Sequence, residues 1–172
     1  MGGRDLLGTG EVSVLRAILQ VISNPRQDIP LLCALASPVF GFTADDLAAL
    51  RAGRKDMELY DALTRFDHPK AEHFLKTLND LRSRAGMVGL AKLLEEIFLA
   101  TRMDSIYAAM TDGVERSANL RTFFNIAVEF ESASRRDLDQ FLEHLDALEE
   151  SGLRLQDAAS GGAVTIMSIH KS

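Results

Sequence analysis

The sequence has one cysteine, no tryptophan and no long uninterrupted hydrophobic run. Cys33 has no second thiol for a disulfide or a Cys-x-x-Cys metal pair, so we expect it to be a small core residue. No apolar run approaches the ~18 residues of a membrane span, and residues 1–4 do not open a signal peptide. These absences predict a soluble, cytoplasmic protein with no membrane contact.

Apolar residues are nevertheless abundant enough to form a core. Of the 172 residues, 47% are hydrophobic and 26% are charged, a balance typical of one compact domain. The formal net charge of −6 argues against a surface that coats nucleic acid, because phosphate neutralisation needs clustered Lys and Arg. The charge is uneven, since residues 1–55 carry a net +1 and residues 111–172 a net −5. A face that touches DNA is therefore expected in the first third or at the extreme C-terminus.

Helical periodicity runs through most of the sequence. Apolar residues recur at the i, i+3, i+4 and i+7 spacing of amphipathic helices, and Pro and Gly punctuate the segments. Two patterns, Thr43 with Asp46 and Ser134 with Asp137, resemble capping boxes that satisfy the free N–H groups of a helix start. The sequence thus predicts an all-α fold of about nine helices. The expected helices cover residues 11–23, 29–36, 43–52, 57–66, 70–84, 90–101, 103–110, 115–134 and 137–150.

The last residues differ from the rest. After a polar, glycine-containing linker over residues 153–162, the run from Val164 to Ser172 alternates and is rich in β-branched residues, which predicts one short C-terminal strand. Such a strand would deliver Ser168, His170 and Lys171 to a sheet edge, where they could meet phosphate or substrate. A strand needs neighbours to pair with, and the preceding sequence is helical. We therefore expect the chain to be a piece of a larger protein.

Three short segments resemble landmarks of the UvrD-like superfamily 1 DNA helicases. They are Asn-Pro-Arg-Gln-Asp-Ile-Pro-Leu at 24–31, Ser-Pro-Val-Phe-Gly-Phe-Thr at 37–43 and Ile-Met-Ser-Ile-His-Lys-Ser at 166–172. The resemblance is closest to the AddA type, the helicase and nuclease subunit of bacterial double-strand-break processing complexes. It implies that residues 1–162 are the helical insertion called subdomain 2B. Residues 163–172 would be the return strand into subdomain 2A, at the start of helicase motif V.

The resemblance also implies an activity for the larger protein. Members are ATP-dependent 3′–5′ DNA helicases and exonucleases of repair and recombination that use ATP and Mg²⁺, act on duplex and single-strand junctions, and join a partner nuclease subunit in the AddAB complex. The present sequence shows no phosphate-binding loop, acidic Mg²⁺ motif or nuclease carboxylate cluster. We expect no catalytic residue, no metal site and no cofactor in this chain, and hence no catalysis by it alone.

The resemblance places two sets of candidate DNA contacts on the chain. At the C-terminus, Ser168 and His170 match the motif V positions along the single-strand track, and Lys171 could add a phosphate contact. The simpler interpretation is a solvated chain end.

The second set surrounds a turn formed by Gly41, Phe42 and Thr43, which matches the turn that touches duplex DNA in UvrD-like 2B subdomains. A glycine turn before a helix start presents free N–H groups to a phosphate. Asp45 and Asp46 argue against this role, because they would already satisfy the helix dipole. The supporting cations would be Arg26, Arg51, Arg54 and Lys55, which could equally be ordinary solvated surface.

Two other interpretations remain open at this point. A self-contained helical scaffold that binds another protein and has no DNA role fits the acidic helices of residues 115–150. A helical enzyme of one function fits less well, because the sequence has no catalytic constellation. The adjacent pairs Glu95-Glu96 and Glu149-Glu150 point about 100° apart on a helix and are expected to be solvated faces.

Overall fold

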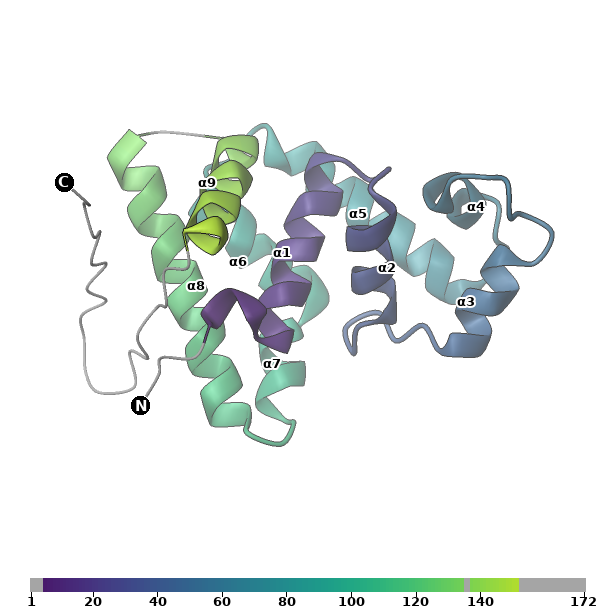
Figure 1. Ribbon diagram of the computed structural model, residues 1–172, viewed down its shortest axis with the longest axis horizontal. Helices are drawn as coiled ribbons and strands as arrows, with labels where there is room; N and C mark the ends of the chain where they lie inside the picture. The colour runs from purple at the N-terminus through teal and green to yellow at the C-terminus, as the bar shows by residue number, and fades with distance from the viewer. Residues whose placement is uncertain (1–4, 135–136, 152–172) are drawn as a thin grey trace.

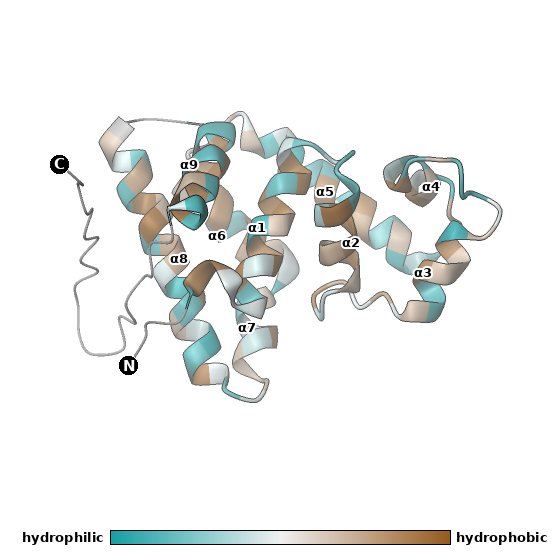
Figure 2. Cartoon of the chain, in the orientation of Figure 1, coloured by the Kyte–Doolittle hydropathy of each residue, from teal (hydrophilic) through white to brown (hydrophobic). Residues whose placement is uncertain are grey.

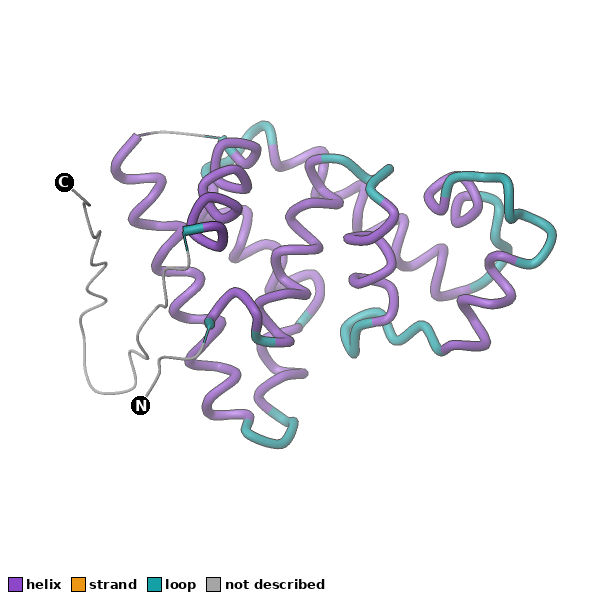
Figure 3. Tube along the Cα trace, in the orientation of Figure 1, coloured by secondary structure: helices purple, strands orange, loops and turns teal. Residues whose placement is uncertain are grey.

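The computed structural model describes residues 5–134 and 137–151 of the chain. Every regular element in these ranges is a helix (Figure 3), which confirms the predicted all-α class. The predicted linker and the strand at 163–172 lie outside the described residues. The described elements are η1 (Leu6–Gly8), α1 (Gly10–Ser23), α2 (Asp28–Ala36), α3 (Ala44–Arg51), α4 (Leu59–Thr64), α5 (Pro69–Ala85), α6 (Leu90–Thr101), α7 (Met103–Ala108), α8 (Gly113–Ser134) and α9 (Leu138–Glu150).

Helix α1 lies at the centre of the molecule. It contacts η1, α2, α5, α8 and α9, and in Figure 1 it runs between the α8–α9 side and the α2–α5 side. Its apolar residues point in several directions, and Val12, Leu15 and Leu19 are completely buried. Figure 2 shows hydrophobic segments along α1 and its neighbours. The core is thus continuous along the molecule and is built around one helix.

A buried carboxylate fixes α1 against α8. Glu11 is only 2% exposed. Its Oε1 accepts a hydrogen bond from Asn119 Nδ2 at 2.7 Å, and its Oε2 accepts one from the Arg116 guanidinium at 2.8 Å. Burial acts to raise the pKa of Glu11, but hydrogen bonds from Asn119, from its own backbone N–H and from Thr9, together with the positive charge of Arg116, outweigh it, so the pKa is lowered. Glu11 therefore stays ionised inside the core.

Helix α9 packs against α1 and α8. The Arg16 guanidinium on α1 donates to Asp146 at 2.5 Å and to Glu149 at 2.8 Å. The Phe141 ring meets Phe123 of α8 edge-on, with the ring centroids 5.8 Å apart. Glu149 and Glu150 are exposed, as expected, although Glu149 also pairs with α1. Glu96 on α6 departs from the expectation of a solvated face, because its side chain is only 14% exposed.

The start of α9 corrects one prediction. The pattern of Ser134 with Asp137 is not a capping box, because Ser134 is the last residue of α8 and Asp137 is itself the N-cap of α9. The Asp137 carboxylate accepts the backbone N–H of Gln140 at 3.0 Å. An aspartate is as good an N-cap as a serine, so the pattern alone does not decide which residue takes that place.

Helices α3 and α4 form an outer lobe, residues 41–66, at the end of the molecule opposite α8 and α9 (Figure 1). Helix α4 packs on α2, α3 and α5, and Leu50 of α3 and Leu63 of α4 are completely buried. Helix α4 is shorter than the predicted 57–66, and the capping box of Thr43 and Asp46 at the start of α3 is confirmed.

A carboxylate from α8 caps the start of α6. The two oxygens of Glu131 accept the backbone N–H groups of Leu90 at 2.8 Å and Ala91 at 3.1 Å. A negative charge at a helix N-terminus is favourable, because it satisfies free N–H groups and meets the positive end of the helix dipole. This close approach requires glycine at position 89, since a Cβ there would lie 1.9 Å from Glu131 Oε1.

We predict that Gly89→Ala lowers the free energy of unfolding by about 1–3 kcal/mol, because the added methyl group displaces the capping carboxylate. Urea denaturation followed by circular dichroism measures this loss. Gly86→Ala is the matched control, since a Cβ at position 86 meets nothing within 4 Å. Equal unfolding midpoints for the two variants would contradict the capping role of Glu131.

Candidate nucleic-acid interface

The predicted turn at residues 41–43 lies between α2 and α3. Gly41 has a φ of +64°, a conformation that glycine adopts without strain, and its N–H donates to Ser37 O at 2.7 Å. The Phe42 side chain is only 4% exposed and anchors the turn in the core. Gly41 and Thr43 are exposed. The turn therefore presents its backbone, but not its aromatic ring, to a ligand.

An internal carboxylate already occupies the start of α3. Asp46 Oδ2 accepts the backbone N–H of Thr43 at 2.8 Å and the ammonium group of Lys70 at 2.5 Å. The same Lys70 Nζ donates to Gly41 O at 2.7 Å, so one cation joins both ends of the turn. The hydrogen bond from Lys70, together with those from Thr43, lowers the pKa of Asp46 to about 2. The carboxylate thus stands where an anion would approach the turn.

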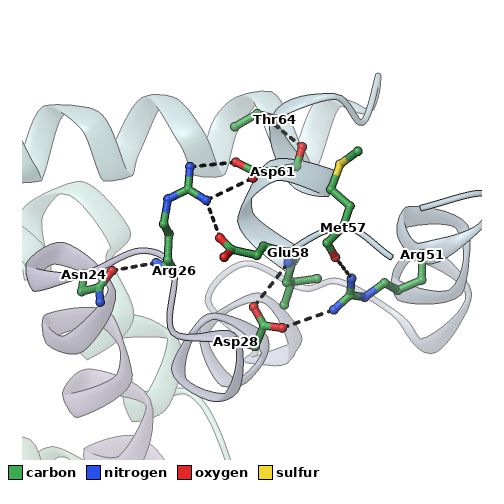
Figure 4. Close-up of polar contacts among 9 residues, drawn as sticks. Asn24, Arg26, Asp28, Arg51, Met57, Glu58, Asp61 and Thr64 are labelled. Atoms are coloured by element: carbon green, nitrogen blue, oxygen red, sulfur yellow. Dashed lines mark hydrogen bonds and ion pairs between the residues drawn. The ribbon is translucent and has the colours of Figure 1, made fainter. Parts of the chain in front are cut away.

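Arg26 is held by two carboxylates of the α4 segment, which comprises residues 58–64. Its guanidinium pairs with Glu58 and forms a two-pronged contact with Asp61 at 3.0 Å, as Figure 4 shows. The guanidinium also lies over the Tyr60 ring, 5.8 Å from its centroid. These hydrogen bonds raise the pKa of Arg26 and lower that of Asp61. Arg26 therefore ties the end of α1 to the outer lobe, and a phosphate would have to compete with both acids.

Arg51 has a similar structural task at the end of α3. It donates to the carbonyl oxygen of Met57 at 2.6 Å and approaches Asp28 at 3.4 Å (Figure 4). Asp28 in turn accepts the backbone N–H of Leu59 at 3.3 Å. These contacts connect the starts of α2 and α4 with the end of α3.

Among the four supporting cations predicted from the sequence, Arg54 and Lys55 have the least internal compensation. The guanidinium of Arg54 donates to three carbonyl oxygens at 3.4 Å and lies over the Phe66 ring. Within the described part of the chain it pairs with no carboxylate. Lys55 is exposed and has no ion-pair partner among those same residues. Both lie just after α3, roughly 12 Å along its axis from the turn at residues 41–43.

The overall charge of this region is close to neutral. Residues 26–70 contain six Lys and Arg against seven Asp and Glu. The acidic residues of and around the α4 segment therefore cancel the net positive charge that residues 1–55 carry. The predicted C-terminal contacts, Ser168, His170 and Lys171, lie outside the described residues.

Sequence reasoning missed three residues that shape this region. Lys70 closes the turn, and Glu58 and Asp61 hold Arg26, but each acts on a residue 24 to 35 positions away in the sequence. No local pattern marks such pairs. Beside them lies His68, the N-cap of α5: its Nδ1 accepts the backbone N–H of Lys70 at 3.2 Å, and its ring stacks on Phe66.

Neither a metal cluster nor a membrane span occurs in the described part of the chain. Within residues 5–134 and 137–151, no group of three or more His, Cys, Asp or Glu side chains is arranged to hold a metal ion. None of the helices in these ranges is long and apolar enough to cross a membrane.

Comparison with known proteins gives a family match along the chain. Residues 1–172 match the family described as the UvrD-like helicase C-terminal domain. ATP-dependent helicase/nuclease subunits of the AddA type are similar to it: that of Acetivibrio thermocellus is 38% identical, that of Thermoanaerobacter sp. 36% and that of Oceanobacillus iheyensis 35%. The alignments cover 99%, 99% and 94% of this chain but only 14%, 15% and 14% of those relatives.

These matches confirm the resemblance drawn from the three short segments, and they do so at a level that shows common descent along almost the whole chain. The chain belongs to the UvrD-like helicase C-terminal domain family, with relatives of the AddA type.

Proposed function

We propose that this chain is the helical 2B-type module, over residues 1–162, of an AddA-type ATP-dependent helicase and nuclease. The observation that carries the proposal is the family match over residues 1–172, joined to 38% identity with an AddA-type helicase/nuclease. The whole enzyme would act as a 3′–5′ motor on DNA in double-strand-break repair and recombination, in the cytoplasm. ATP and Mg²⁺ would bind in its other domains, and a partner nuclease subunit would complete the AddAB-type complex.

Within that enzyme the module would position duplex DNA without taking part in catalysis. The Thr43 hydroxyl beside Gly41 and the side chains of Arg54 and Lys55 offer phosphate contacts at the two ends of α3, since the N–H groups of Gly41 and Thr43 are already bonded within the chain. Such contacts carry no sequence preference, which suits a motor that moves along any DNA. Arg26 and Arg51 would support the interface by holding the outer lobe in place.

The Asp46 carboxylate would limit this contact between the turn and DNA. It already takes the Thr43 N–H and the Lys70 ammonium, which are the donors that a phosphate would need. DNA would therefore meet the turn through the exposed Thr43 hydroxyl while Lys70 stays bound to Asp46. The main electrostatic attraction would fall to Arg54 and Lys55.

A protein-binding scaffold is the second candidate, and one observation favours it. The region of the candidate interface is nearly neutral, because the acids of the α4 segment neutralise Arg26 and Asp28 faces Arg51. A surface with few free cations suits a protein partner better than it suits a polyanion.

Charge reversal at Lys55 separates the two candidates. We predict that Lys55→Glu weakens binding of a labelled duplex with a 3′ single-stranded tail about fivefold and reduces the slope of log K against log salt by about 1. Fluorescence anisotropy across a salt series measures both quantities. Arg121→Glu is the matched control, because Arg121 is an exposed cation on α8, outside the outer lobe. Absence of binding at low salt, or an equal loss in both variants, would rule out the DNA contact and favour the scaffold.

The pairing of Asp46 with Lys70 can be tested through the pKa of the carboxylate. Because the pKa of Asp46 is about 2, below its ordinary value of 3.8, its contribution to stability is present above about pH 4 and is lost as the pH falls through 2. We predict that Lys70→Met raises the pKa of Asp46 toward 3.8, as followed by carboxyl carbon NMR. Lys76→Met, on the same helix, should leave it unchanged. A pKa near 3.8 in the unmodified protein would show that Lys70 does not hold the turn.

A further inference from the structure

The first turn of α5 has one N–H group that only a side chain satisfies. Pro69, the first residue of α5, has no N–H. The N–H groups of Ala71 and Glu72 donate to the carbonyl oxygen of His68 at 3.0 and 3.1 Å. That leaves the N–H of Lys70, which donates to His68 Nδ1 at 3.2 Å. Because the free N–H groups of a helix start need acceptors, the cap of α5 depends on the imidazole ring of His68.

This cap requires a neutral ring. A ring nitrogen accepts a hydrogen bond only while it keeps its lone pair, and both nitrogens of an imidazolium carry a proton. Protonation would therefore set an N–H at Nδ1 against the N–H of Lys70, and two donors cannot bond to each other. It would also place a positive charge at the positive end of the helix dipole. Since histidine is the side chain that changes charge between about pH 5 and 8, the cap is lost within that range when the ring is protonated.

The opposite edge of the ring faces a carboxylate that favours the charged form. His68 Nε2 lies 3.6 Å from Asp46 Oδ1, while the ammonium group of Lys70 occupies the other oxygen of Asp46 at 2.5 Å. Because the pKa of Asp46 is about 2, this carboxylate is ionised throughout the range in which histidine titrates. An imidazolium would thus find an anion beside Nε2 at the same time as Nδ1 stops accepting. The neutral ring suits the start of α5, and the charged ring suits the start of α3.

The remaining neighbours of the ring hold it in place or lie in solvent. Phe66 stacks on it with the ring centroids 5.2 Å apart, and Phe42 lies tilted against it at 6.3 Å. The guanidinium of Arg54 contacts the Phe66 ring, 5.8 Å from its centroid, and adds a like charge beyond that phenyl group. Asp67 and Glu72 are close in sequence but exposed, so solvent and salt screen their charges. The two groups at the edge of the ring therefore decide which of its forms is favoured.

We propose that His68 is a pH-sensitive switch where the outer lobe meets α5. The neutral ring caps α5 through Nδ1, and the imidazolium releases the Lys70 N–H and pairs with Asp46. Lys70 then shares Asp46 with a second cation, which weakens the hold of its ammonium group on the turn at residues 41–43. The switch acts within the chain and does not depend on DNA. Its consequence for DNA, an added positive charge beside the turn at lower pH, rests on the proposed function, and failure of the Lys55 test would remove that consequence alone.

NMR of the full chain between about pH 5 and 8 tests the switch. The ring resonances of His68 report its protonation, and the backbone amide of Lys70 reports the cap. We expect hydrogen exchange at this amide, corrected for its intrinsic dependence on pH, to be about fivefold faster when the ring is charged. The carboxyl carbon of Asp46 should shift with the same midpoint as the ring, although Asp46 itself stays ionised because its pKa is about 2.

His68→Asn is the decisive variant, because asparagine is a good N-cap and does not titrate. It should keep the Lys70 amide protected and the Asp46 carbon unshifted across the whole range. His73→Gln is the matched control, since His73 is an exposed histidine of the same helix and its loss should leave both responses intact. Three results would overturn the proposal: a His68 ring that does not change charge in this range, a Lys70 amide that stays protected when the ring is charged, or equal responses in His68→Asn and the unmodified chain.

Discussion

The buried carboxylate of Glu11 is the constraint on which the arrangement of the helices depends. A charge in a core is stable only when it is paired and hydrogen-bonded, so the Asn119 amide and the Arg116 guanidinium must stand opposite it. That requirement fixes how α8 is rotated about its own axis and how far it is shifted along α1. Helices α2, α5 and α9 also pack on α1, so their positions relative to α8 depend on how α1 and α8 are placed. Arg16, one and a half turns later on α1, fixes α9 in the same way.

This construction sets the outer lobe apart from the rest of the molecule. The outer lobe is joined to the rest through α2, α5 and the pairing of Arg26 with the α4 segment, so its exposed cations face solvent at one end of the molecule. His68 lies where the outer lobe meets α5, which it caps, and its ring stacks on Phe66 and faces Asp46 of the lobe.

Much of the fold could be predicted from the sequence, because its signals are local. The period of apolar residues locates the described helices, and the predicted bounds of α6 are those observed. The pairing of Thr43 with Asp46 is also predictable, since the two lie three residues apart. The pairing of Glu131 with the start of α6, and of Lys70 with Asp46, could not be found this way, because the partners are distant in sequence. The candidate DNA contacts came from family resemblance, and no local pattern indicates that Arg26 and Arg51 are internally paired.

A double-mutant cycle on Glu11 and Arg116 tests the central claim most directly. Urea unfolding of Glu11→Ala, Arg116→Ala and the double variant gives the coupling free energy between the two side chains. If the buried carboxylate fixes α1 on α8, the coupling should be at least about 1 kcal/mol, with each single change strongly destabilising. Losses that add within about 0.3 kcal/mol would show that the two residues act independently, which would contradict the requirement that Arg116 stand opposite the buried carboxylate.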